Sequence, residues 1–184
     1  MMLTAEFFAR PTLQVAPELL GATLFVETDE GQCSGRIVEV EAYLGSEDAA
    51  SHAAGGVTPR SSVMFGAPGR TYVYLIYGMH HCLNFVTESE GTPGAILIRG
   101  LEPLTGLDLM MARRGVSVEK DLCNGPGKLC RALAIDRTWN DLPLTGQSPQ
   151  KIYLNSSEKV FKYIQSPRIG IREAMDLPYR FSTS

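Results

Sequence analysis

Apolar and polar residues alternate over several short stretches of the chain, which is the period of a half-buried β-strand. Residues 22–28, ATLFVET, and residues 35–43, GRIVEVEAY, alternate in this way around the polar segment 29–32. This arrangement predicts a β-hairpin. Further strands are predicted where similar patterns return, at residues 71–77, 80–86, 95–101, 151–154, 168–171 and 179–182.

Helical spacing of apolar residues occurs near the N-terminus and again after the main run of strands. Helices are predicted at residues 5–10, around 17–20, at 104–114 and at 127–135. Thr4 is a candidate N-cap for the first helix, and Gly21 ends the second. The order of elements predicts an α+β fold with a curved antiparallel sheet and flanking helices, in a single domain spanning residues 1–184.

A long irregular stretch, residues 45–70, separates two of the predicted strands and is rich in Gly, Ser, Pro and Ala. Loops of this length are uncommon inside a domain and are usually functional or disordered. The stretch is therefore a candidate part of a functional site.

The composition is that of an ordinary globular protein, with 184 residues, 44% of them hydrophobic and 20% charged. The N-terminus has no signal-peptide pattern, and no apolar run approaches the about 18 residues that span a bilayer. We expect a cytoplasmic protein without a membrane segment. The four cysteines form no CxxC pair and the three histidines have no metal-ligand spacing, so we expect buried thiols and no metal.

The charge is unevenly distributed along the chain, although its net value is −3. Residues 113–172 contain 11 Lys and Arg against 5 Asp and Glu, whereas residues 1–112 contain 5 against 13. A basic C-terminal third is suited to contact phosphates. A solvated surface of mixed charge explains the same counts equally well.

Glu39, Glu41 and Tyr43 follow each other at a spacing of two, so they share one face of their predicted strand. Such a polar face usually points to solvent. Here the strand runs directly into the long loop, and tyrosines cluster shortly afterwards, which makes the face a candidate site.

Tyr72 and Tyr74 share a strand face, as packing aromatics often do, but Tyr77 breaks the alternation. Tyr77 is followed by Gly78 and is therefore expected at the tip of a turn. An aromatic side chain in this place is suited to insert between stacked bases.

Several long blocks resemble, in order, those of the alkyladenine (3-methyladenine) DNA glycosylase family, from about residue 8 to about residue 182. The blocks are EAYLGSEDAASH (41–52), TPR (58–60), MFGAPGRTYVYLIYGMHHCLN (64–84), AILIRGLEPLTGL (95–107) and LCNGPGKLCRALAI (122–135). The resemblance implies a fold like the C-terminal domain of formyltransferases. It also implies a monomeric enzyme without a cofactor, whose partner is double-stranded DNA containing damaged purines.

The resemblance implies a role for individual residues. Glu41 matches the general base that activates water, and Arg99 matches the arginine that holds this water. Tyr43 and His52 would line one side of the base pocket, with Tyr74 stacking on the opposite face. Asn84 matches the residue that clashes with the exocyclic amine of guanine.

The resemblance also implies contacts with DNA. Tyr77 would be the wedge that fills the gap left by a flipped base. The other residues implied to contact DNA are Met79, Arg60, Gly125, Gly127 and Lys128. The GPGK segment is not a nucleotide-binding P-loop, because Leu129 stands where Ser or Thr is required. We therefore expect no nucleotide cofactor.

Physical chemistry agrees with these roles. Alkylated purines of the 3-methyladenine or 7-methylguanine kind are cationic and stack well between aromatic rings. Neutral lesions of the hypoxanthine or ethenoadenine kind would need protonation as they leave. The chain has no lysine before Lys120, so the predicted sheet offers no amine for a Schiff base, which favours an enzyme that leaves an abasic site.

Two segments depart from the family pattern, a shorter loop between His52 and Thr58 and a longer segment at residues 87–94. Both flank the predicted pocket, so they bear on substrate range, and the chain resembles a compact bacterial-type member. Three alternatives stay open at this point: a lesion-binding protein that does not cut, an RNA-binding module and a nucleoside hydrolase.

Overall fold

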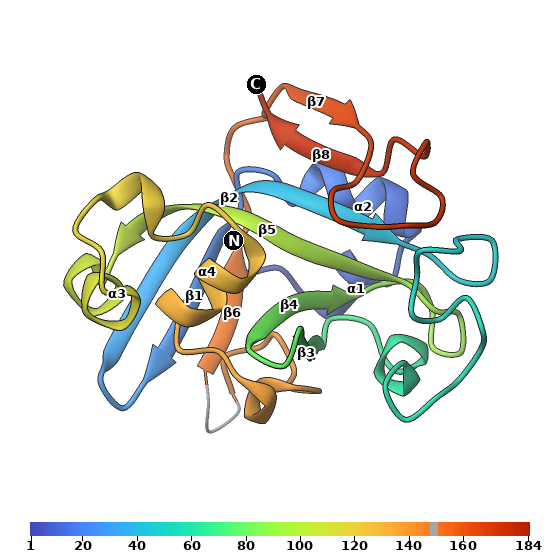
Figure 1. Ribbon diagram of the computed structural model, residues 1–184, viewed down its shortest axis with the longest axis horizontal. Coiled ribbons are helices and arrows are strands. Elements are labelled where there is room, and N and C mark those ends of the chain that lie inside the picture. Colours follow the sequence, from blue (N-terminus) through green and yellow to red (C-terminus); the bar gives the residue numbers. More distant parts are fainter. Residues whose placement is uncertain (148–150) are drawn as a thin grey trace.

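An eight-stranded sheet organises the part of the chain that the computed structural model describes, residues 1–147 and 151–184 (Figure 1). Its main path runs β3-β4-β5-β2-β1-β6, with β8 paired to β2 and β7 paired to β8. The strands are β1 Thr23–Thr28, β2 Gly31–Tyr43, β3 Thr71–Ile76, β4 His80–Val86, β5 Ala95–Thr105, β6 Lys151–Asn155, β7 Tyr163–Ser166 and β8 Arg180–Thr183. Every strand pairing is antiparallel, which confirms the predicted sheet.

Strand β2 is the longest, with 13 residues, and pairs with β1, β5 and β8. Its pairing with β5 shifts register around residues 34–35 and 37–40. Such bulges bend a strand and increase its twist. The sheet therefore curls, and the end of β2 that carries Glu39 and Glu41 lies between β5 and β8.

Helices cover both faces of the sheet. They are α1 Ala5–Phe8, α2 Thr12–Glu18, α3 Leu107–Arg114 and α4 Pro126–Ala132, with 3₁₀ turns η1 Ser62–Phe65, η2 Glu119–Asp121 and η3 Arg137–Trp139. In Figure 1, α1 and α2 lie behind the sheet and α4 lies in front of it. Helix α4 packs on β4 and β5, and α2 packs on β2.

Two groups of buried apolar residues hold the layers together. The larger one joins the sheet to the helices and includes the fully buried Phe8, Leu24, Ile37, Phe85 and Ile96. The smaller one fixes the long loop after β2 to strands β3, β4 and β5 and contains Ala53, Met64, Tyr72, Val86 and Ala95. The loop is therefore a packed part of the fold and can hold side chains in place.

The prediction of a helix over 104–114 was wrong at its start. Leu104 and Thr105 extend β5, and α3 begins at Leu107. Gly106 separates the two elements with a left-handed φ of 75°. A Cβ atom there would lie 2.6 Å from the Cys33 sulfur, so glycine is required where the chain turns from strand to helix.

The other helix predictions shifted at their ends. Thr4 occupies the N-cap position of α1, but its side chain makes no capping hydrogen bond. Helix α2 begins earlier than predicted, at Thr12, whose backbone N–H and hydroxyl both donate hydrogen bonds to Glu88. The helix ends at Glu18. Helix α4 runs over Pro126–Ala132 instead of 127–135.

The predicted strand at 168–171 was also wrong. Strand β7 lies before it, at Tyr163–Ser166, and residues 168–171 form an irregular segment. Its backbone and side chains are used in other contacts: Arg168 binds Asp48, and the Ile169 N–H donates to Glu41. Apolar residues alternate in this segment, but its residues make these long-range contacts and do not pair with a neighbouring strand.

Candidate active site

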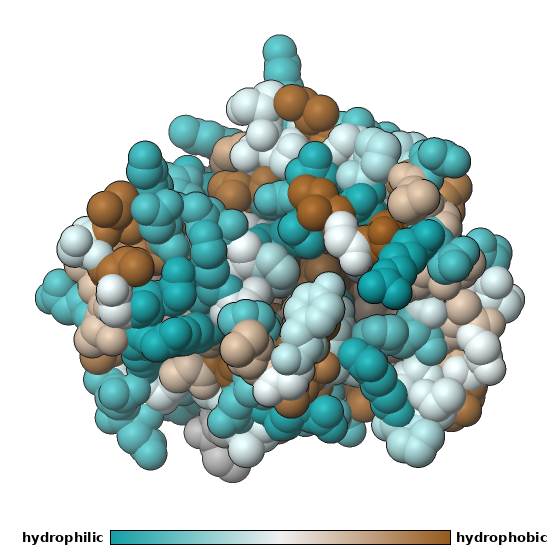
Figure 2. Space-filling view, in the orientation of Figure 1, coloured by the Kyte–Doolittle hydropathy of each residue, from teal (hydrophilic) through white to brown (hydrophobic). Residues whose placement is uncertain are grey.

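A cavity of about 720 Å³ opens on the face of the molecule that carries α4. Its walls come from β2, the long loop, strands β3 to β5, the start of α4 and the segment 169–173. Figure 2 shows this face hollowed near its centre, with pale and brown side chains between teal ones. Segments far apart in the sequence therefore meet around one space large enough for a purine.

Glu41 lies directly behind this cavity and is fully buried. Its Oε1 accepts a hydrogen bond of 2.7 Å from the Ile169 N–H and lies 3.4 Å from the Arg99 Nε. Its Oε2 accepts a hydrogen bond of 2.8 Å from the Tyr43 hydroxyl. All three contacting residues line the cavity, so the carboxylate is one contact away from it.

Burial is the largest influence on the Glu41 pKa and raises it above the ordinary value. Arg99, the Ile169 N–H and the Tyr43 hydroxyl act in the opposite direction. Burial outweighs these three contributions, so the pKa stays above its ordinary value. A carboxylate with a raised pKa, two hydrogen-bond donors and an ion-paired arginine is suited to act as a general base.

Arg99 comes from β5 and bridges the two glutamates of β2. Its Nε lies 3.2 Å from Glu39 Oε1 and 3.4 Å from Glu41 Oε1. Arg180 of β8 also binds Glu39, at 2.9 Å. Glu39 and Glu41 thus share one face of β2, as the spacing predicted, but that face is an ion-pair network at the cavity and not a solvated surface.

A second ion pair, Arg168 with Asp48, fixes the segment that contacts Glu41. The two side chains are fully buried and make two bonds, of 2.6 and 2.7 Å. Arg168 also donates to the Ala42 carbonyl oxygen at 2.9 Å. The pair therefore ties the segment 168–173 and the start of the long loop to β2, next to Glu41.

Tyr43, at the end of β2, and Tyr74, on β3, are aromatic walls of the cavity, and Tyr43 contacts the Glu41 carboxylate. Burial raises the pKa of both hydroxyls, and Glu41 raises that of Tyr43 further. Tyr43 therefore stays protonated and keeps donating its hydrogen bond to Glu41. Both rings line the cavity.

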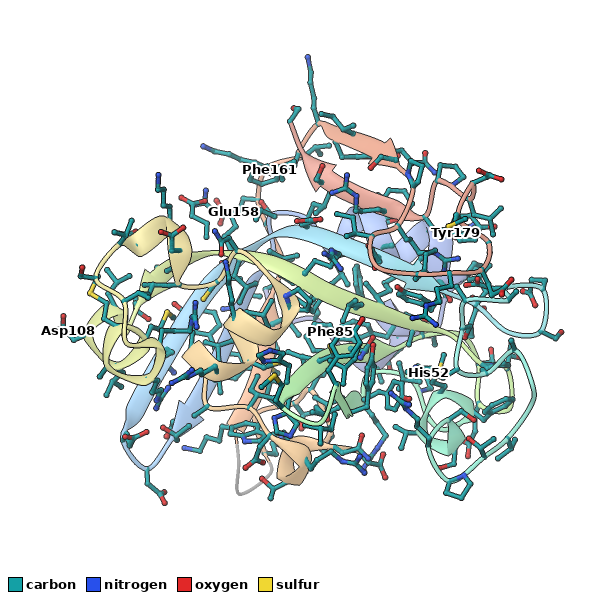
Figure 3. The ribbon with its side chains drawn as sticks, in the orientation of Figure 1. His52, Phe85, Asp108, Glu158, Phe161 and Tyr179 are labelled. Atoms are coloured by element: carbon teal, nitrogen blue, oxygen red, sulfur yellow. The ribbon has the colours of Figure 1, made fainter. Side chains whose placement is uncertain are left out.

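His52 lies on the long loop, next to the strands that carry the tyrosines (Figure 3). Its ring meets the Tyr74 ring edge-on, with 4.7 Å between centroids, and its Nδ1 lies 2.9 Å from the Tyr72 hydroxyl. Burial, helped by the charge of Arg60, lowers the pKa of His52 to about 4. The sequence analysis placed His52 across from Tyr74, whereas in the structure the two rings are in edge-on contact.

Asn84 lies at the floor of the cavity on β4 and is buried. Its side-chain nitrogen donates to the carbonyl oxygen of Tyr72 at 3.0 Å and approaches that of Cys82 at 3.5 Å. These bonds fix the orientation of the amide. A rigid polar group in this place is suited to discriminate between bases by shape.

The hairpin between β3 and β4 carries an exposed aromatic tip. Tyr77 and Gly78 both have positive φ, 52° and 68°, and the Tyr77 side chain is 81% exposed. Met79 beside it is 70% exposed. A left-handed backbone at a tyrosine costs on the order of 1–3 kcal/mol and is found mainly at functional positions. The turn therefore presents Tyr77 at the cavity rim, which it also lines.

The N-terminal end of α4 packs against the base of this hairpin. A Cβ atom on Gly127 would lie 3.1 Å from the Cβ and Cγ of His80, so only a small residue permits the contact. Lys128 donates to Asn124 at 2.7 Å, and Gly125 and Lys128 line the cavity with Gly127. The structure thus brings Tyr77, Met79 and the GPGK segment to one rim.

Three of the 11 cations in the basic segment 113–172 bind carboxylates. Arg113 binds Glu30 at 2.8 Å, Lys151 binds Glu27 at 2.9 Å, and Arg168 is buried with Asp48. Arg60, which the resemblance assigns to DNA contact, lies with its guanidinium 5.0 Å from the centre of the Tyr74 ring. Counts of charged residues along the sequence do not reveal these contacts, because they form only in the folded protein.

The four cysteines lie in the described part of the chain and are buried free thiols, as predicted. Within residues 1–147 and 151–184 there is no group of three His, Cys, Asp or Glu side chains that could hold a metal ion. Over the same residues, we find no helix with the length and apolar character needed to cross a bilayer.

Sequence reasoning missed Asp48, Arg168 and Ile169 as parts of the site. Asp48 lies inside the block EAYLGSEDAASH and was available as a candidate, whereas the segment around Arg168 was interpreted as a strand. Ile169 contributes through its backbone N–H, which the amino-acid type does not reveal.

Fold and site together define an enzyme that hydrolyses N-glycosyl bonds, and comparison with known proteins agrees. A sequence profile described as Methylpurine-DNA glycosylase matches residues 6–184. Relatives named "Putative 3-methyladenine DNA glycosylase" include those of Rhodopseudomonas palustris (49% identical over 98% of this chain and 84% of the relative) and Methanoculleus marisnigri (48%, over 98% and 94%). One from Methanocella arvoryzae is 44% identical, over 98% and 91%. The chain belongs to the methylpurine-DNA glycosylase family.

Proposed function

We propose that this protein is a monofunctional DNA glycosylase that acts in base excision repair on double-stranded DNA. It takes alkylated or deaminated purines, of the 3-methyladenine, 7-methylguanine, hypoxanthine and ethenoadenine kinds, and leaves an abasic site. The observation that carries the proposal is the Glu41 carboxylate, held by Arg99, Tyr43 and the Ile169 N–H behind an aromatic cavity. We expect the protein to act as a monomer in the cytoplasm.

The proposed chemistry breaks the bond between the purine nitrogen and the sugar C1′. The electron pair leaves with the base, and the sugar develops oxocarbenium character. The carboxylate stabilises this charge and takes a proton from a water whose oxygen bonds to C1′. A cationic purine leaves as a neutral base, whereas a neutral lesion must gain a proton as it departs.

Base flipping is the step that brings the purine to this chemistry. Enzymes that act on a base must extrude it from the stack, at a cost of a few kcal/mol. The exposed Tyr77 is suited to fill the gap, and Tyr43 and Tyr74 are suited to stack on the extruded base. Damaged bases unstack more easily, so extrusion itself favours lesions.

A base-release assay tests the proposal directly. Duplexes that each carry one lesion are incubated with the protein, and the free base is quantified. Release of at least one of these purines, with an abasic site left behind, is expected. Tight lesion binding without any release would instead identify a damage-recognition protein, and preference for structured RNA would identify an RNA-binding module.

Replacing Tyr77 with Ala should weaken binding to lesion duplexes, because the gap in the stack is then left empty. Excision from single-stranded DNA should fall less, since no stack has to be broken there. The two losses are measured by fluorescence anisotropy and by single-turnover release. Equal losses on both substrates would assign Tyr77 a role in folding. Replacing the exposed Val160 with Ala is the control for loss of a surface apolar side chain.

Replacing Asn84 with Ser should raise the release of guanine-type bases relative to hypoxanthine. The shorter side chain removes the group expected to meet the guanine amine, and the serine hydroxyl can still donate at this buried position. The ratio of the two release rates is the measurement. An unchanged ratio would leave Asn84 with only its structural bonds to the backbone of β3 and β4.

A further inference from the structure

Two aromatic walls of the cavity, Tyr43 and Tyr74, each have an arginine guanidinium against the ring. The Cζ of Arg168 lies 4.6 Å from the centre of the Tyr43 ring, and the Cζ of Arg60 lies 5.0 Å from the centre of the Tyr74 ring. Tyr43 and Tyr74 line the cavity, whereas neither arginine is among the residues that line it. Each guanidinium therefore lies against its ring without forming part of the cavity wall.

The two arginines differ in charge compensation. Arg168 is neutralised by Asp48 in a fully buried, two-bond ion pair. Arg60 forms no ion pair with a carboxylate in residues 1–147 or 151–184. The charge behind Tyr43 is balanced locally, and the charge behind Tyr74 is not.

The surroundings of Arg60 already respond to its charge. Burial is the main cause of the lowered pKa of His52, whose ring touches Tyr74, and of the raised pKa of the Tyr72 hydroxyl. The charge of Arg60 adds to the first shift and opposes the second. Both groups line the cavity. The field of Arg60 therefore reaches the space in which a base would stack.

We propose that Arg60 is a specificity-determining residue that disfavours positively charged purines relative to neutral ones in the slot beside Tyr74. This inference rests on the proposed function. The negative face of an aromatic ring attracts cations. When a guanidinium already lies against one side of Tyr74, a cationic base on the other side gains less from the ring and is repelled by the guanidinium. A neutral base stacks without this penalty.

The role differs from the DNA contact that the family resemblance implies for Arg60. A phosphate contact would strengthen binding of every duplex equally, whatever the lesion, and would contribute to the salt dependence of binding. A charge behind the base slot would change the ratio between lesions and leave the salt dependence nearly unchanged. The two roles can therefore be separated in one set of measurements.

The test compares Arg60→Gln, Arg60→Lys and the wild type on two duplexes, one with cationic 7-methylguanine and one with neutral hypoxanthine. Both single-turnover release and duplex affinity are measured. For Arg60→Gln, the ratio of 7-methylguanine to hypoxanthine should rise about threefold, as expected for loss of a partly screened unit charge. Arg60→Lys keeps the charge, so its ratio should stay near that of the wild type. Arg36→Gln, which removes an exposed arginine of β2 paired with Glu102, is the control for the change in net charge.

An equal loss of affinity for both duplexes, with the salt slope reduced by about one, would make Arg60 a phosphate contact and overturn the proposal. An unchanged ratio in Arg60→Gln would overturn it as well. Failure of the wild type to release either base would contradict the proposed function. In that case the affinity ratio still decides the role of Arg60.

Discussion

Glu41→Gln should lower base release at least about a hundredfold at neutral pH, because general base catalysis alone contributes two to four orders of magnitude. The amide keeps the size of the side chain but cannot take a proton from water or stabilise an oxocarbenium ion. Lesion binding should survive, since the aromatic walls and the rim are unchanged. Single-turnover release and duplex affinity measure the two effects separately.

The pH profile of release gives a second readout of Glu41. The working form is the ionised carboxylate, so release is present above the Glu41 pKa and is lost as the pH falls through it. Because burial raises this pKa above 4.5, the acid limb should lie above that pH. Glu41→Gln should lose this limb together with most of its activity. A wild-type acid limb well below pH 4.5 would remove Glu41 from the role of base.

The choice of control follows from the ion-pair network. Glu39 lies on the same strand face and binds both Arg99 and Arg180, so Glu39→Gln should have an intermediate effect. Glu102→Gln is the neutral comparison, because Glu102 is exposed and pairs with Arg36 at 3.0 Å. Near-full activity of Glu41→Gln would refute the assignment. Loss of binding and cutting together would make Glu41 a structural residue.

Arg168→Met should lower the free energy of unfolding by about 3–5 kcal/mol, because it leaves Asp48 buried without its charge partner. For a chain of this size the melting temperature should fall on the order of 10 °C. Release should also fall, since the Ile169 N–H that donates to Glu41 loses its anchor. Thermal unfolding and release at a temperature below both transitions measure the two losses.

Two further variants separate stability from positioning. Arg168→Met combined with Asp48→Leu replaces the pair with apolar groups and should recover most of the stability. Release should recover less, because the two bonds that orient the segment are still missing. Arg172→Met, in the same segment, should change the melting temperature by about 2 °C or less. A single variant Arg168→Met that melts like the wild type would contradict the role of the ion pair.

Much of the sheet could be predicted from local patterns, because alternation reports which face of a strand is buried. The strands around the hairpin and the shared face of Glu39 and Glu41 were predicted in this way and are present. The exposed turn at Tyr77 was also predicted from the break in alternation before Gly78. These features depend on neighbours in sequence, which the chain displays directly.

The contacts that position the carboxylate depend on residues far apart in sequence. Arg168 and Asp48 are separated by 120 positions, and Ile169 and Glu41 by 128. A periodic pattern along the chain cannot reveal pairs so far apart. Residues 168–171 were predicted to be a strand because their apolar residues alternate. The charge counts likewise do not show that three cations of the C-terminal third bind carboxylates from the other part of the chain.

The burial of the four thiols has a chemical consequence for a protein of this family. The thiolate is the form of cysteine that reacts with electrophiles. Burial raises the pKa of each of the four thiols, to about 12 for Cys123. At neutral pH the folded protein therefore presents almost no thiolate to methylating agents. The four cysteines are therefore poor targets for the reagents that methylate purines in DNA.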